Sequence, residues 1–206
     1  MASTPSAYHR GIAEEKRAAI LAAALTLFVE RGYDGTSLAR VAEAAAVSTA
    51  TLFKRFPTKA DLFEAIVRDF WRDEGGASAP PASGEPVVGL RVLMHRYAAL
   101  LRRDGMVGLH RMVVAEAPRF PELARIQFGL GKEPFFDEVR RYVEAERDRG
   151  TLRIDDPVMA VTQLQGMVSN FVLWPKLLLA SWDPTPAEVA AAVDEAVRTF
   201  LARYGA

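Results

Sequence analysis

The amino-acid sequence predicts an all-α protein, and three observations support this fold class. The alternation of polar and β-branched residues that marks strands is scarce, whereas alanine is abundant. Apolar residues recur three and four positions apart in most segments. Ser, Thr, Pro and Gly stand where such segments begin and end. These patterns predict about nine helices in all.

The first two predicted helices precede residue 46. The stretch "EEKRAAILAAALTLFVERG" carries apolar residues at helical spacing, and Gly32 is a plausible C-terminal stop. Thr36 or Ser37 then caps a short helix that runs to about Ala45. Leu38, Val41, Ala42 and Ala45 lie on one face of this second helix.

Two further helices follow at once. Ser48 caps a short helix that ends near Phe56, because Pro57 cannot continue it. Thr58 caps the next helix, and the carboxylate of Asp61 favours its positive start.

The Gly-, Ser- and Pro-rich stretch 75–86, "GGASAPPASGEP", has the composition of a linker. We therefore predict a small N-terminal domain over residues 1–57, a connecting helix over 58–74 and a larger helical domain over 75–206. The larger domain is expected to hold five helices, at about residues 87–103, 106–117, 121–149, 157–181 and 186–204, and a break of the third at Gly129–Gly131 is left open.

Two short helices joined by "AAAVS" form a helix-turn-helix candidate. Small side chains at Thr49, Ala50 and Thr51 suit a helix start that must approach base edges closely. Lys54 and Arg55 point toward solvent or phosphate if the apolar positions of this helix are buried. An ordinary solvated pair of amphipathic helices remains the alternative.

Charge is balanced over the whole chain but not locally. The 26 basic and 26 acidic residues give a formal net charge of zero, which excludes a globally basic nucleic-acid binder. Residues 36–59, however, carry four basic side chains, Arg40, Lys54, Arg55 and Lys59, against the single acidic residue Glu43. A local basic face is therefore expected.

The sequence predicts no enzyme. His9, His95 and His110 do not pair at metal-ligand spacing, and the chain has no cysteine. The stretch "GLGK" lacks the upstream Gly and the Ser/Thr of a phosphate loop, and no G-x-S-x-G motif exists. We expect no cofactor and no metal.

The sequence also predicts a cytoplasmic protein. "MASTPSAYHRG" lacks the apolar core of a secretory signal, and no apolar stretch is long enough to span a membrane.

The stretch "GYDGTSLARVAEAAAVSTATLFKRFPTKADLF", with the preceding "AILAAALTLFVERG", resembles the N-terminal DNA-binding domain of TetR-type transcriptional regulators. The likeness covers about residues 16–70 and agrees in order and spacing. Three positions depart from the common pattern. Ala46 stands where Gly is usual, Phe53 where Tyr is usual, and Arg55 where Tyr or His is usual. A left-handed backbone at Ala46 would cost about 1 kcal/mol, unless the turn adopts a different conformation.

The resemblance assigns roles to individual residues. It implies phosphate contacts from Thr36, Ser37 and Lys59. The major groove should face Thr49, Ala50, Thr51 and Lys54, and Lys54 is the first choice for a guanine contact. The full set of expected DNA-binding residues is Thr36, Ser37, Ser48, Thr49, Ala50, Thr51, Phe53, Lys54, Arg55 and Lys59.

The later stretch "RMVVAEAPRFPELARIQFGLG" resembles the C-terminal domain of one TetR subgroup, the AefR-like repressors. The resemblance to TetR-type regulators implies a homodimeric repressor on a palindromic operator, released by a small-molecule effector that the resemblance does not name. The aromatic and Met content of the candidate effector residues, most of which could instead be ordinary helical core, favours a hydrophobic or aromatic effector. The expected dimer residues, which could instead be intrachain core, are Leu164, Val168, Val189, Val193, Ala196, Val197, Phe200 and Tyr204. The expected effector residues are Met94, Tyr97, Met106, His110, Phe128, Gln163, Met167, Asn170, Phe171 and Trp174.

Two other functions remain open on the sequence. The chain could be a helical ligand-binding protein whose DNA-binding head has lost its function, or a purely structural interaction bundle. Duplex binding that falls steeply with salt would favour the regulator, because it reports counterions displaced from DNA.

Overall fold

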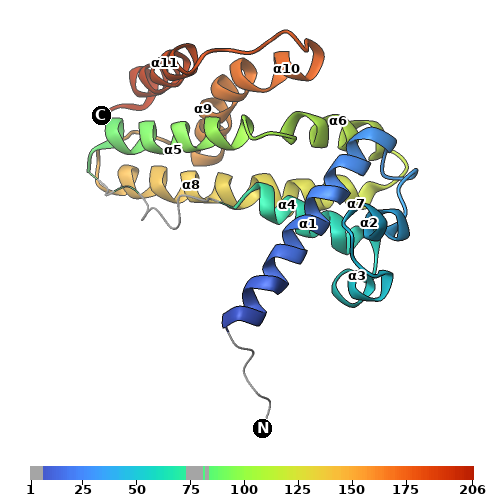
Figure 1. Cartoon of the computed structure of the whole chain (residues 1–206). Coiled ribbons are helices and arrows are strands. Elements are labelled where there is room, and N and C mark those ends of the chain that lie inside the picture. The colour runs from blue at the N-terminus through green and yellow to red at the C-terminus, as the bar shows by residue number, and fades with distance from the viewer. Residues whose placement is uncertain (1–6, 73–80, 82–83) are drawn as a thin grey trace. The chain divides into compact units, whose positions relative to one another are not determined.

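The computed structural model describes residues 7–72, 81 and 84–206. Within these ranges the chain forms eleven α-helices, one π-helical turn and no strand, which confirms the all-α prediction (Figure 1). None of the described helices is both long and apolar enough to cross a membrane. The chain divides into two compact units, and each combines two separate stretches of sequence.

The first unit comprises Met1–Asp69 and Gly108–Gln127. Its N-terminal part contains the helices α1 (Ala7–Arg31), α2 (Leu38–Ala44), α3 (Thr49–Arg55) and α4 (Lys59–Phe70), the last of which ends one residue beyond the unit. The ring of Phe28 on α1 lies 5.4 Å from that of Tyr33 and 6.3 Å from that of Phe63 on α4. These rings pack α4 and the loop after α1 against the long first helix.

The stretch Gly108–Gln127 also belongs to this first unit, although it lies within the range 75–206 expected for the larger domain. It contains most of α6 (Met106–Glu116) and all of α7 (Pro121–Ile126). The Phe120 ring packs 5.1 Å from that of Tyr33, and Arg119 forms an ion pair with Asp34 at 3.0 Å. Aromatic packing thus groups these residues with the N-terminal helices.

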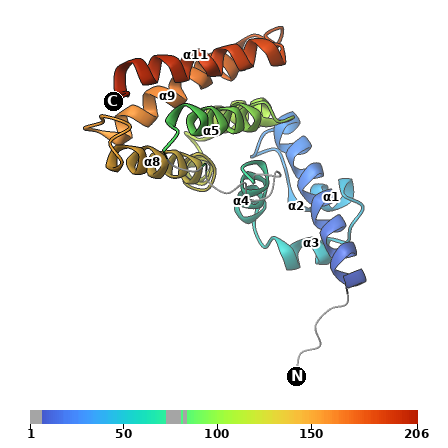
Figure 2. The ribbon, with the colours of Figure 1, turned by 90° about the vertical axis from the view of Figure 1, so that its left-hand side faces the viewer.

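The second unit comprises Phe70–Val107 and Phe128–Ala206. Its helices are α5 (Pro86–Leu101), α8 (Glu133–Asp148), α9 (Pro157–Val172), α10 (Trp174–Leu178) and α11 (Pro186–Tyr204). Helix α11 packs against both α9 and α5, and α5 runs beside α8 (Figures 1 and 2). Side chains from these helices, such as Leu93, Val139, Leu164 and Phe200, fill the core.

The number of helices exceeds the nine predicted, because two expected long helices are each interrupted. The π-helical turn η1 (Gln127–Lys132) separates α7 from α8. A side chain at Gly131 in this turn would place its Cβ 2.4 Å from Trp71 Nε1. The position of the Trp71 ring therefore leaves no room for a residue larger than glycine. The second break falls at Leu173, before Pro175 in α10, since proline cannot donate the backbone hydrogen bond that a continuous helix needs.

Helix starts follow the predicted capping residues. The Ser37 and Ser48 hydroxyls cap α2 and α3. The Thr185 hydroxyl accepts from the backbone N–H of Glu188, whose carboxylate accepts from the backbone N–H of Thr185. This reciprocal pair is a capping box, and it fixes where α11 begins.

Candidate functional site

The turn between α2 and α3 brings the two helices together as a helix-turn-helix. Ala46 has a φ of +51°, the left-handed backbone that the glycine usual at this position adopts more readily. Its neighbour Val47 donates its backbone N–H to the Ala42 carbonyl at 3.0 Å. Leu52 on α3 is completely buried and secures that helix to the unit.

Helix α3 leaves most of its other side chains in solvent. Thr49, Ala50, Phe53 and Lys54 are exposed, and Phe53 is 46% exposed. The Thr51 hydroxyl lies 2.7 Å from that of Ser48, so it supports the helix cap as well as lying near the surface. A short helix with small and hydroxyl side chains at an exposed start can approach base edges in a major groove.

Cationic groups beside this helix are unpaired within the described parts of the chain. Lys54 on α3 and Arg40 on α2 are exposed, and Arg55 is half-buried. None of the three forms an ion pair with a described residue. Their charges are therefore available to phosphate, which is how most protein–DNA affinity arises.

Arg40 is a candidate that the residue-by-residue assignment from the sequence omitted. It lines a shallow open groove of about 680 Å³ together with residues 34–39, Phe53 and Lys59. Its position three residues after the Ser37 cap puts it in the first turn of α2. The excess of basic residues over residues 36–59 was the signal that could have identified it.

Lys59 is held by its own unit. Its ammonium donates to the Tyr33 carbonyl at 2.7 Å and to the Asp34 carbonyl at 3.4 Å. It also lies 4.6 Å from the centre of the Tyr33 ring. The lysine therefore clamps the loop between α1 and α2, and at most one of its three N–H groups remains for a phosphate.

The pKa of the Tyr33 phenol is raised to about 12, chiefly by burial and then by the negative charges of Glu122 and Asp61. The ring beneath Lys59 is thus neutral at ordinary pH.

Thr36 is also structural, which corrects its assignment as a phosphate contact. The residue is only 2% exposed, and its hydroxyl lies 2.9 Å from the Gly32 carbonyl and 3.1 Å from the Leu27 carbonyl. Leu27 lies in the last turn of α1 and Gly32 directly follows that helix, so the hydroxyl supports the loop in which α1 ends. A buried hydroxyl engaged in this way cannot reach a phosphate. Ser37, beside it, is exposed.

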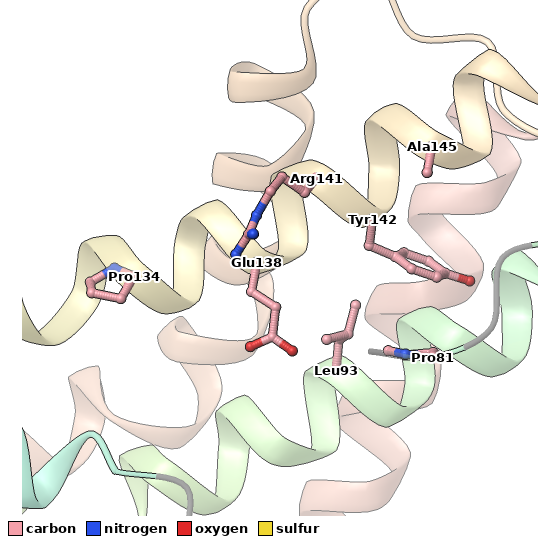
Figure 3. Close-up of a pocket in the computed structure, with 7 residues that line it drawn as sticks. All are labelled: Pro81, Leu93, Pro134, Glu138, Arg141, Tyr142 and Ala145. Atoms are coloured by element: carbon pink, nitrogen blue, oxygen red, sulfur yellow. The ribbon is translucent and has the colours of Figure 1, made fainter. Parts of the chain in front are cut away.

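The second unit contains a pocket of about 470 Å³ between α5 and α8 (Figure 3). Leu93 contributes from α5, whereas most of the lining side chains project from α8. The lining residues are Pro81, Leu93, Pro134, Glu138, Arg141, Tyr142 and Ala145. Pockets of this size accommodate small organic molecules.

None of the predicted effector residues lines this pocket. Met94, Tyr97 and Met106 are buried core, and Met167 and Phe171 are partly buried against that core. His110 is half-buried in the first unit. The remaining four, Phe128, Gln163, Asn170 and Trp174, are exposed.

The sequence analysis missed the α8 residues because their mixed charged and apolar pattern is that of an ordinary surface helix. They line a pocket because α5 packs beside α8 and encloses the space between the two helices.

The expected dimer residues lie in or against the hydrophobic core of the second unit. All but one are buried inside the second unit, and Tyr204 is half-buried with its hydroxyl on the Gln163 side-chain oxygen at 2.8 Å. Phe200, for example, is 1% exposed. The stripe therefore packs mainly within its own chain, although Val189 and Ala196 keep 6% and 4% of their surface accessible.

Two family models match the chain over the segments just described. Residues 20–66 match the model "Bacterial regulatory proteins, tetR family", which includes α2, the turn and α3. Residues 88–206 match the model "AefR-like transcriptional repressor, C-terminal domain". The chain belongs to the TetR family of bacterial transcriptional regulators. It is a DNA-binding regulator and not an enzyme, and the resemblance noted in the sequence is confirmed.

Individual TetR relatives are moderately similar. The transcriptional repressor KstR of Rhodococcus jostii is 30% identical over 46% of this chain and 44% of its own length. An uncharacterised HTH-type transcriptional regulator of Mycobacterium tuberculosis is 26% identical over 89% of this chain and 87% of its own length. The solved structure of the flavonoid-responsive regulator FrrA has a TM-score of 0.72 and is 27% identical, covering 92% of this chain and 97% of that one.

Proposed function

We propose that this TetR-family protein is a cytoplasmic homodimeric repressor, released from a palindromic operator by a small apolar or aromatic effector. The observation that carries the proposal is the exposed face of α3, where Lys54 has no carboxylate partner among the described residues. Thr49 and Ala50 share that exposed surface, and Arg40 and Arg55 supply further charge. The structurally similar FrrA is named as responsive to a flavonoid, an aromatic small molecule, which supports the effector class.

A dimer is proposed because one seven-residue recognition helix reads few base pairs, whereas two-fold pairing doubles the contact. Since the apolar stripe of α11 packs mainly within its own chain, we propose that the dimer uses surface that one chain leaves exposed. Helix α9 offers such surface at Val158 and Met159, which are 53% and 51% exposed. The molar mass of the purified protein in solution tests this part of the proposal.

Release would follow from a shift between two conformations. An effector that binds the low-affinity conformation more tightly weakens operator binding by that difference alone. Helix α4 is the proposed coupling element, because it begins beside the DNA-facing helices at Lys59 and ends at Phe70, the first residue of the second unit. A tilt of α4 would change the spacing of the two recognition helices in the dimer.

The test is selection of duplexes from a random pool by the purified protein at about 0.1 M salt, where electrostatic binding is retained. Lys54→Ala is the test variant, and Arg149→Ala, an equal charge change on an exposed residue of the second unit, is its control. We expect the parent and the control to enrich one palindrome. Lys54→Ala should relax one position of each half-site, since a base contact contributes about 1–3 kcal/mol of discrimination.

If Lys54 contacts only phosphate, the palindrome stays the same and the salt slope falls by about 0.9 for each phosphate that the variant no longer neutralises. No enrichment by a well-folded dimer would contradict the proposal and favour a ligand-binding protein with a non-functional head.

A further inference from the structure

The pocket between α5 and α8 has an asymmetric distribution of charge that identifies the kind of molecule it can hold. This inference rests on the proposed function, because it assigns the effector's place and chemistry. The walls are mainly apolar, formed by Leu93, Pro134, Ala145 and the ring of Tyr142 (Figure 3). Two charged side chains, Glu138 and Arg141, lie one helical turn apart on α8 and also line the pocket.

The negative charge of Glu138 is already neutralised. Arg96 on α5 donates to both carboxylate oxygens of Glu138, at 2.6 and 3.3 Å. The two side chains are 19% and 24% exposed, so this bidentate pair is partly shielded from water. A molecule in the pocket therefore meets no free carboxylate at this position.

Arg141 differs because its charge is not compensated. Its Nε donates a hydrogen bond to the Asp137 backbone carbonyl at 3.2 Å, and the side chain forms no ion pair with any described residue. The preceding Arg140, by contrast, is held by Asp137 and Glu144. The remaining N–H groups of Arg141 can donate to an incoming anion, for which a planar guanidinium is well suited.

Tyr142 forms a further part of the pocket wall and is fixed in place. Its hydroxyl donates to the Glu85 carbonyl at 3.3 Å, and its ring occupies space that a side chain at Gly89 would fill. The nearby carboxylate of Glu146 already accepts from the Gly84 N–H at 2.7 Å and from the Thr151 hydroxyl at 2.5 Å. This part of the wall is therefore a rigid, largely apolar surface rather than a free anionic one.

We propose that this pocket binds an amphipathic organic anion, with its carboxylate on the Arg141 guanidinium and its apolar body between Leu93, Tyr142 and Ala145. The ligand class is set by one exposed cation, which has no ion-pair partner among the described residues, in a mainly apolar pocket. The apolar wall can contact either an aromatic or an aliphatic body. The charge of the head group therefore decides which ligands bind tightly.

Three probes of the same shape test the proposal: biphenyl-4-carboxylate, biphenyl-4-carboxamide and biphenyl-4-ylmethylammonium. Binding to the intact full-length protein is measured by titration calorimetry. We expect the carboxylate to bind about tenfold more tightly than the carboxamide, which is what a hydrogen bond to a charged group contributes. The cation should bind most weakly.

Arg141→Gln should remove that preference, weakening the carboxylate about tenfold and leaving the carboxamide unchanged. Arg149→Gln, an equal charge change outside the pocket, should leave all three affinities as they are. Ala145→Trp, which fills the cavity, should abolish binding of every probe while the helical content and melting temperature report that the protein is folded.

Tightest binding by the cation, an Arg141→Gln variant with unchanged preference, or no binding by any probe would each overturn the proposal. The measurement does not involve DNA. A protein that binds the probes but selects no duplex would contradict only the proposed function. A protein that selects a palindrome but binds no probe would contradict only the pocket proposal.

Discussion

Replacement of Lys59 by methionine tests whether this residue serves the fold or the DNA. The sequence resemblance places Lys59 on a phosphate, whereas the structure ties its ammonium to the carbonyls of Tyr33 and Asp34. Methionine keeps the length of the aliphatic stem and removes the charge and the three N–H donors. We therefore expect Lys59→Met to loosen the loop between α1 and α2.

The magnitude follows from the contacts. A hydrogen bond from a charged donor contributes about 1.5–3 kcal/mol, and the one to Tyr33 is short at 2.7 Å. The contact to Asp34 at 3.4 Å is at the limit of hydrogen bonding and adds little. The cation over the Tyr33 ring contributes about 0.5–1 kcal/mol at a partly exposed site. Because Lys59 is half-buried, water replaces part of this, and we expect a loss of about 1–3 kcal/mol in the free energy of unfolding.

Two assays distinguish the roles. Denaturant unfolding and amide hydrogen exchange over residues 33–37 report the loop, while operator affinity at several salt concentrations reports phosphate contacts. Lys54→Met is the matched control, because Lys54 is exposed and has no ion-pair partner among the described residues. It should leave stability unchanged and lower affinity. A Lys59→Met protein of unchanged stability, with a salt slope reduced by about 0.9, would refute the structural role.

Three further changes have defined outcomes. Ala46→Gly should raise the free energy of unfolding by about 0.5–1 kcal/mol, because the left-handed backbone at φ +51° costs alanine more than it costs glycine; a destabilised variant in denaturant melts would contradict this. Phe200→Ala should cost about 3–5 kcal/mol in the same melts, since the ring is completely enclosed by its own chain; a small loss would contradict its core role. Burial raises the pKa of Tyr33 and that of Tyr97 to about 12. Because the folded state then holds these protons more tightly, their contribution to stability is complete below about pH 10 and is lost as pH rises toward 12. Replacing both with Phe should flatten this alkaline decline in unfolding free energy, and an unchanged decline would exclude these tyrosines as its source.

Local signals were sufficient for the helix-turn-helix. Ser37 and Ser48 each bond to a backbone N–H three residues ahead, so the caps depend only on neighbouring sequence. The same holds for the capping box of α11 and for the left-handed Ala46, which occupies a position set by the turn itself. The sequence could therefore predict which residues of α3 form its exposed start.

Roles that depend on distant partners could not be predicted in this way. Lys59 was assigned to phosphate by resemblance, but its ammonium donates to a carbonyl 26 residues away in sequence, and the Thr36 hydroxyl reaches back to the Leu27 carbonyl nine residues earlier. The sequence shows that a hydroxyl or an ammonium is present, but it does not show whether that group bonds to DNA or to a carbonyl elsewhere in the chain. Only the packing of α1 against α2 and α4 decides between them.

The sequence by itself determined the all-α class, the helix starts and the exposed second helix of the helix-turn-helix, because capping bonds and apolar periodicity act within a few residues. The tertiary structure alone decided what each apolar stripe packs against and where a cavity remains. The stripe of α11 predicted burial but not the partner, which proved to be its own chain. In the same way, Arg141 and Tyr142 line a pocket only because Leu93, some fifty positions earlier in the sequence, is brought beside them by the packing of α5 on α8.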